Sequence, residues 1–179
     1  MADTDSIDVN YRIHSIDVPH YMCTEIGVAE IGPEDIAIRF GWNIAVAETE
    51  RQIACVGILN AFTTTDSPRL MIAFIMRCFF EVESLEGFPR NEGSIRIPDD
   101  FIITMLSVTY STMRGSLYER LSSTVYRQIV LPPGDPVAMF EVGPTNAPIE
   151  SSPAASTIEK ADYGDIPSKS KKIRQPRSR

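Results

Sequence analysis

Three segments in the first half of the chain carry the residue patterns of β-strands. Residues 36–47 place apolar side chains at every second position, with small or polar residues between them. Residues 52–63 follow a short polar turn, and the nearly continuous apolar run 70–82 follows a second turn. Because successive side chains of a strand point to opposite faces of a sheet, the period of two predicts strands. The apolar run predicts a strand that is covered on both faces or that contributes to an interface.

An alternating pattern at residues 11–18 precedes these three segments. It predicts a first strand that stops at Pro19, followed by a connecting stretch that contains Gly27, Gly32 and Pro33. Short polar turns join the later segments to one another. The four strands are therefore expected to form one antiparallel sheet.

The period changes to that of a helix in the second half of the chain. Pro98 followed by Asp99 and Asp100 is typical of a helix start, because proline fits the first turn and acidic side chains face the positive end of the helix dipole. An apolar stripe with spacings of three and four predicts a helix of about 25 residues. The stripe consists of Ile102, Leu106, Thr109, Met113, Leu117 and Leu121. A short second helix is expected at 135–141, after the break at residues 132–134.

This order of elements predicts an α+β fold: a four-stranded antiparallel sheet followed by a long helix and a short C-terminal helix. One long helix covers only one face of such a sheet. The large apolar side chains exceed what one helix can cover, which predicts either an oligomer or an exposed apolar groove. These side chains are Trp42, Phe74, Met76, Phe79 and Phe80.

The composition divides the chain into three parts. Residues 144–179 are rich in proline, serine and charge and have few large apolar residues, so they predict a disordered tail. Residues 1–8 are expected to be disordered as well. The domain is therefore placed at 9–143.

The charge is distributed unevenly along the chain. Residues 1–150 hold ten arginines, no lysine and 21 acidic residues, which gives a net charge of −11. Residues 151–179 hold seven basic and three acidic residues, a net charge of +4. The acidic body does not favour nucleic acid as a partner. The basic tail is interpreted as a solubilising segment, with docking to nucleic acid or to an acidic partner as the alternative.

No pattern in the sequence indicates catalysis, a cofactor or a metal. The nucleophile-elbow, phosphate-loop, dinucleotide-binding and zinc-protease motifs are absent. His14, His20 and Cys23 match no zinc spacing, and the three cysteines lie far apart. The acidic N-terminus lacks the apolar core of a signal peptide, and no run of about 18 apolar residues occurs. A cytoplasmic protein without enzymatic activity and without membrane insertion is therefore expected.

Residues 97–140 resemble the C-terminal half of the SecB and SecB-like chaperones. The similar positions are Thr112-Met113-Arg114-Gly115 on the long helix, the Pro-containing segment 129–133, and the short last helix 135–140. Residues 79–87 also resemble the end of that family's last strand, which closes on an acidic glycine turn. With the strand pattern before it, the resemblance covers about residues 10–142.

The resemblance implies a holdase chaperone that binds unfolded proteins in apolar grooves and needs no ATP. It implies protomers that pair their sheets and dimers that pack through the long helices into a homotetramer. Ser107, Ser111, Thr112 and Gly115 suit that helix contact. The residues expected to line the groove are Tyr21, Met22, Ile26, Val28, Ile31, Phe40, Trp42, Val125, Tyr126 and Ile129. For each of them an ordinary core position is the alternative, and for Trp42 the core is favoured.

The implied partner is an unfolded client, either a preprotein for export or an aggregation-prone antitoxin. Export members of the family pass clients to SecA through an acidic sheet surface and a short, often acidic tail. Here residues 70–76 contain no acidic residue and the tail is long and basic, which argues against SecA. A non-catalytic scaffold whose basic tail docks an acidic partner or nucleic acid is the alternative function.

Overall fold

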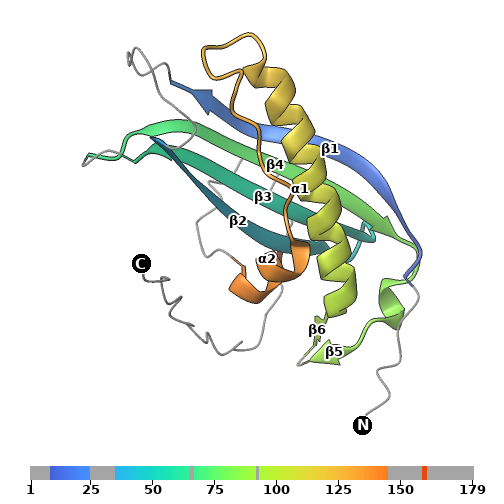
Figure 1. Cartoon of the computed structure of the whole chain (residues 1–179). Coiled ribbons are helices and arrows are strands. Elements are labelled where there is room, and N and C mark those ends of the chain that lie inside the picture. The colour runs from blue at the N-terminus through green and yellow to red at the C-terminus, as the bar shows by residue number, and fades with distance from the viewer. Residues whose placement is uncertain (1–8, 25–34, 65–66, 92, 145–158, 161–179) are drawn as a thin grey trace, which may run out of the picture.

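Four long strands form an antiparallel sheet in the order β1-β4-β3-β2 (Figure 1). The computed structural model describes residues 9–24, 35–64, 67–91, 93–144 and 159–160. The strands are β1 Tyr11–Cys23, β2 Ile36–Ala47, β3 Gln52–Thr63 and β4 Leu70–Val82. The last three have the bounds that the hydrophobic pattern predicts. A fifth, two-residue strand, β7 Glu159–Lys160, pairs with β2.

The predicted end of the first strand at Pro19 is wrong, because β1 continues to Cys23. A proline lacks the backbone N–H that a ladder needs, but an edge strand tolerates it. β1 is an edge strand, and its register against β4 shifts between Ile13 and Ser15 and again between Asp17 and His20. Residues 21 and 22, which were expected in the connecting stretch, are therefore part of β1.

The long helix α1 spans Asp99–Leu121 and crosses one face of the sheet over β3 and β4 (Figure 1). It begins after Pro98, whose carbonyl oxygen accepts hydrogen bonds from the backbone N–H groups of Phe101 and Ile102. All six residues of the predicted apolar stripe are buried. The period of the sequence thus identified the face of the helix that packs on the sheet.

The short helix α2 spans Pro136–Val142 and packs beside α1 over β2. Asp135 caps it, since its carboxylate accepts hydrogen bonds from the N–H groups of Val137 and Ala138. The structure confirms the predicted α+β class and the order of sheet, long helix and short helix. It adds a one-turn helix, η2 Leu85–Gly87, and a small hairpin, which the sequence analysis did not predict. The hairpin pairs β5 Arg90–Asn91 with β6 Ser94–Ile95.

The core lies between the sheet and the two helices. Trp42, Phe74, Met76 and Phe80 are all buried on the helix-facing side of the sheet, whereas Phe79 lies on the opposite side. The two helices therefore cover four of the five large side chains that the sequence predicts to exceed what one helix can cover. Part of the apolar surface that remains open lies on β1.

Most of the ends that were predicted to be disordered lie outside the described residues. The exceptions are residues 144 and 159–160. The first belongs to the segment after α2, and the other two form β7.

Candidate functional site: an open apolar surface on β1

The helix-facing side of β1 carries an apolar surface that α1 does not cover. We call Tyr11, Ile13 and Ile16 the β1 strip. Ile13 lies opposite Phe80 of β4, and Ile16 lies opposite Cys78; both of these partners are fully buried in the core. Directly opposed residues of two paired strands share a face of the sheet. Ile13 and Ile16 nevertheless keep 46% and 48% of their surface exposed.

The first register shift of β1 places both isoleucines on one face. In a regular strand, residues three positions apart point to opposite faces of the sheet. The shift between Ile13 and Ser15 inserts an extra residue, so that Ile16 returns to the helix-facing side. A β-bulge thereby joins two half-exposed isoleucines into one apolar surface.

At the N-terminal end of β1, this surface ends in aromatic contacts with α1. The Tyr11 ring lies 5.2 Å from the Phe101 ring on α1 and 5.8 Å from the Phe80 ring on β4, measured between ring centroids. Tyr11 itself is 39% exposed. Its ring therefore continues the open surface toward the start of α1.

A second aromatic cluster bounds the surface at the other end of β1. The Tyr21 ring meets the Phe74 ring edge-on, with 5.9 Å between centroids. The Arg120 guanidinium, near the end of α1, lies 5.1 Å from the Tyr21 ring centroid and 5.9 Å from that of Phe74. Burial raises the pKa of Tyr21, with a further contribution from Cys23 beside it. At neutral pH the Tyr21 phenol at this end of the surface is therefore uncharged, and the cationic Arg120 guanidinium packs on its ring.

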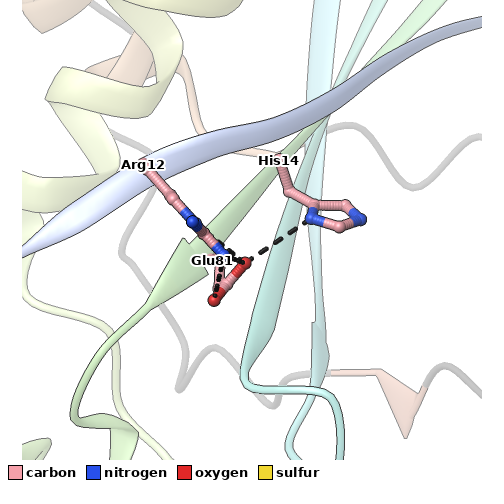
Figure 2. A network of polar contacts seen from close by, with 3 residues as sticks. All are labelled: Arg12, His14 and Glu81. Carbon is pink, nitrogen blue, oxygen red and sulfur yellow. Dashed lines mark hydrogen bonds and ion pairs between the residues drawn. The ribbon is translucent and has the colours of Figure 1, made fainter.

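From Arg12 to Asp17 the opposite face of β1 is polar. Figure 2 shows Arg12 and His14 of β1 meeting Glu81 of β4. Arg12 donates hydrogen bonds to both carboxylate oxygens, and His14 Nδ1 lies 3.5 Å from Glu81 Oε2. The Arg12 hydrogen bond holds the pKa of Glu81 below its ordinary value. On the same face Asp17 pairs with Arg77. β1 therefore separates an apolar face from a charged one.

Those predicted groove residues that the structure describes do not share one open surface in the single chain. Tyr21 is half-buried on the helix-facing side, but Met22 lies opposite Ala73 on the other face of the sheet. Val125, after α1, is 63% exposed. Ile26, Val28 and Ile31 lie outside the described residues.

The other predicted groove residues contribute to packing inside the chain. Trp42, Tyr126 and Ile129 are buried, with 2%, 4% and 7% of their surface exposed. The Tyr126 hydroxyl donates a hydrogen bond to the carbonyl oxygen of Thr24, which ties the segment after α1 to the end of β1. Phe40 is half-buried, and its ring meets the Tyr110 ring edge-on at 5.2 Å. In this conformation Trp42, Tyr126 and Ile129 are covered by the chain itself.

The small residues that were expected at a helix contact form a row on the outer side of α1. Ser107, Ser111 and Gly115 are spaced four apart and all are exposed. A Cβ added to Gly115 would meet no atom within 4 Å. The hydroxyl of Thr112, the fourth predicted residue, donates to the carbonyl oxygen of Val108 in the same helix. The row is open in the single chain, and its role as an interface stays a prediction.

Ile13 and Ile16 were missed by the sequence analysis, although one signal for them exists. Both are apolar, and their odd spacing conflicts with the simple alternation of residues 11–18. A bulge resolves that conflict, but the pattern alone does not say where a bulge lies. Nor does it say that β1 is an edge strand that α1 leaves uncovered.

Neither a metal centre nor a membrane helix is found in the described part of the chain. Within these residues, no three His, Cys, Asp or Glu side chains gather closely enough to hold a metal ion. None of the described helices combines the length and apolar character needed to cross a membrane.

Comparisons with known proteins find several similar solved structures, among them the following two. One is a SecB-like chaperone from Mycobacterium tuberculosis in complex with a peptide from an antitoxin. It is 12% identical with a TM-score of 0.45, over 68% of this chain and 89% of that chain. The other is a protein of unknown function from Streptococcus agalactiae, 14% identical with a TM-score of 0.39, over 70% of this chain and 98% of that one. No family model and no curated protein matches the sequence. Similarity at this level does not assign a function.

Proposed function

We propose that the chain is a holdase chaperone, without catalytic activity or need for ATP, that binds unfolded segments of client proteins on the β1 strip. One observation carries the proposal. Ile13 and Ile16 stand half-exposed beside the buried core, on a face that α1 leaves open. Contiguous exposed apolar surface of this kind is typical of interaction sites.

The shape of the surface favours an extended occupant. From Ile13 to Tyr21 the strand covers roughly 26 Å, at about 3.3 Å per residue, which suits a client segment of about eight extended residues. Burying the exposed halves of Ile13 and Ile16 contributes about 2 kcal/mol in total, since full burial of one such side chain is worth about 1.5–3 kcal/mol. A single surface of this size binds weakly. Several copies in one oligomer increase the apparent affinity.

The remaining predicted groove residues enter the proposal in different ways. Tyr21 and Val125 are proposed as further client contacts. Ile26, Val28 and Ile31, which lie outside the described residues, stay predicted client contacts. The buried residues among the predicted groove residues are proposed to stabilise the core beneath the site and not to contact the client. These are Trp42, Tyr126 and Ile129.

The proposed clients are a preprotein awaiting export or an aggregation-prone antitoxin, in a cytoplasmic setting. Both follow from the resemblance of residues 97–140 to the SecB-like chaperones. The proposed assembly is a homotetramer in which the row of Ser107, Ser111 and Gly115 packs against a second α1. SecA is not part of the proposal, because residues 70–76 contain no acidic residue and the tail is basic.

The experiment is suppression of aggregation of a reduced, unfolded model protein in the absence of nucleotide. The variant Ile13→Ser/Ile16→Ser removes the apolar groups of the strip. The matched control, Val137→Ser/Val142→Ser, removes two exposed valines of α2, which are 48% and 84% exposed. The proposal predicts that the wild type and the control suppress aggregation and that the strip variant loses most of this activity.

Light scattering on the same variants separates client binding from self-association. If Ile13→Ser/Ile16→Ser changes the mass of the particle but leaves suppression of aggregation intact, the β1 strip is a subunit interface and the proposal is wrong. Failure of the wild type itself to suppress aggregation also contradicts the proposal. In that case the scaffold function, with the basic tail as the docking element, becomes the better hypothesis.

A further inference from the structure

The two edges of the sheet differ in how they are protected. An unpaired edge strand presents free N–H and C=O groups to other chains, and proteins guard such edges with proline, bulges or charges. β1 has all three: Pro19, two register shifts, and the charged residues Arg12 and Asp17. A second chain is poorly matched to that edge.

The β2 edge lacks these protections. β2 pairs with β3 over all twelve positions from Ile36 to Ala47 without a register shift. The strand contains no proline, and Arg39 is its only charged residue. A long, regular, largely apolar edge of this kind is a site for pairing with another strand.

The chain's own C-terminal segment pairs with this edge. β7 lies antiparallel to β2, with Glu159 opposite Val46 and Lys160 opposite Ala45. The occupied positions are at the end of β2 nearest the turn to β3. Addition of a strand to an exposed sheet edge is a known mode of peptide recognition, in which backbone hydrogen bonds supply the affinity.

We propose that Glu159–Lys160 is a built-in, detachable strand that occupies the β2 edge and prevents a second copy of this chain from pairing there. Two residue pairs form a weak contact on their own. Because β7 and β2 belong to one chain, their pairing is intramolecular, and an effective concentration on the order of millimolar lets it outcompete a second copy at micromolar concentration. The proposal is independent of client binding, because β1 and β2 are opposite edges of the original four-stranded sheet.

Cysteine cross-linking in the full-length chain tests this register directly. The background carries Cys23→Ala, because Cys55 and Cys78 are buried whereas Cys23 is not. The test pair is Ala45→Cys with Lys160→Cys, which are directly opposed. The control pair is Ala37→Cys with Lys160→Cys. Ala37 shares its face of β2 with Ala45 and is partly exposed like it, but lies eight positions away, roughly 26 Å.

The proposal predicts at least a tenfold higher yield of intramolecular disulfide for the Ala45 pair than for the Ala37 pair, measured by mass at low protein concentration. Equal yields, or no intramolecular product from either pair, overturn the pairing. A product that is mainly a disulfide-linked dimer also overturns it, because the segment then pairs with another copy instead of its own β2.

Proline substitution tests the protective role. Lys160→Pro removes a backbone donor from β7, and Ser170→Pro is the control further along the tail. The proposal predicts that Lys160→Pro forms larger assemblies than the wild type at about tenfold lower protein concentration, in sedimentation experiments. It also predicts that adding Ala45→Lys, which places a charge on the edge strand, restores the wild-type behaviour. Identical sedimentation of Lys160→Pro and Ser170→Pro overturns the protective role.

Discussion

The indole of Trp42 on β2 donates a hydrogen bond from Nε1 to the carbonyl oxygen of Met139 on α2, across 2.8 Å. The same ring stacks on Phe140 with 6.3 Å between centroids. The bond attaches the short C-terminal helix to a strand 97 residues earlier in the chain. Trp42 thus has a structural role at a position where the sequence also suggested client contact.

Replacing Trp42 with phenylalanine should destabilise the protein. Trp42→Phe leaves the Met139 carbonyl without its donor and reduces the contact with Phe140, so we expect a loss of about 1–3 kcal/mol in unfolding free energy. Urea unfolding followed by circular dichroism measures it. Tyr118→Phe on the outer side of α1, where Tyr118 is 56% exposed, is the control and should unfold as the wild type does. Equal stability of the two variants would show that this bond does not hold α2 in place.

Alanine substitution at two glycines should change the unfolding free energy in opposite directions. A Cβ added to Gly134 would lie 2.5 Å from Cε1 of the Tyr110 ring. The ring cannot move aside easily, because its hydroxyl donates a hydrogen bond to the Pro132 carbonyl oxygen. Gly134→Ala is therefore expected to lower the unfolding free energy by about 1–3 kcal/mol. Gly115→Ala fills open space within a helix and should raise it by about 0.5–1 kcal/mol.

Gly115→Ala also tests the predicted helix contact between protomers. If α1 packs closely on a second α1 at the row of Ser107, Ser111 and Gly115, the added methyl group weakens the assembly. Light scattering should then show a smaller particle at low concentration while the single chain stays folded. A particle of unchanged mass at every concentration would place the subunit contact elsewhere.

The three thiols should differ in reactivity. Burial raises the pKa of Cys55 to about 12 from 9.0 and also raises that of Cys78. A shift of this size lowers the thiolate fraction of Cys55 near pH 8 by roughly a thousandfold. Cys23 is only partly buried. Alkylation of the native protein should therefore modify Cys23 first, as read by peptide mass. Modification of Cys55 at the same rate would contradict its burial.

Acid should weaken the attachment of β1 to β4. The Arg12 hydrogen bond lowers the pKa of Glu81 from 4.5, so the folded state favours the carboxylate. The resulting stabilisation is present above pH 4.5 and is lost as the pH falls through the lowered pKa. Arg12→Gln should therefore lose less stability than the wild type between about pH 5 and pH 3 in urea unfolding. Because the pair is exposed, the difference should be small and should shrink in high salt. Parallel acid profiles would mean that the pair does not stabilise β1.

Strong local patterns predicted the fold accurately. The bounds of β2 follow from its alternation, those of β3 and β4 follow from apolar segments bounded by polar turns, and the buried side of α1 follows from its apolar stripe. The prediction that β1 ends at Pro19 is wrong, because proline is tolerated within a strand at the edge of a sheet. Whether a proline ends a strand depends on whether that strand lies at the edge of the sheet, and this is a property of the tertiary structure.

The candidate site was harder to predict than the fold. Exposure of Ile13 and Ile16 depends on a bulge and on the path of α1 across β3 and β4. The odd spacing of the two isoleucines indicates a bulge without locating it, and the path of the helix has no local signal. Trp42 and Tyr126 look like groove residues because they are large and aromatic. Trp42 is buried because α2 returns to β2 from a distant position in the chain. Tyr126 is buried because the segment after α1, to which it belongs, returns to the end of β1. The sequence therefore identifies the apolar residues, but it does not show which of them the helices cover.

The most direct test of the central claim is the affinity for an unfolded, fluorescently labelled apolar peptide, measured by anisotropy without nucleotide. The account predicts that Ile13→Ser/Ile16→Ser weakens binding by roughly 30-fold, which corresponds to about 2 kcal/mol, while Val137→Ser/Val142→Ser binds as the wild type does. Equal affinity of the wild type and the strip variant, with both folded, would show that the β1 strip is not where clients bind.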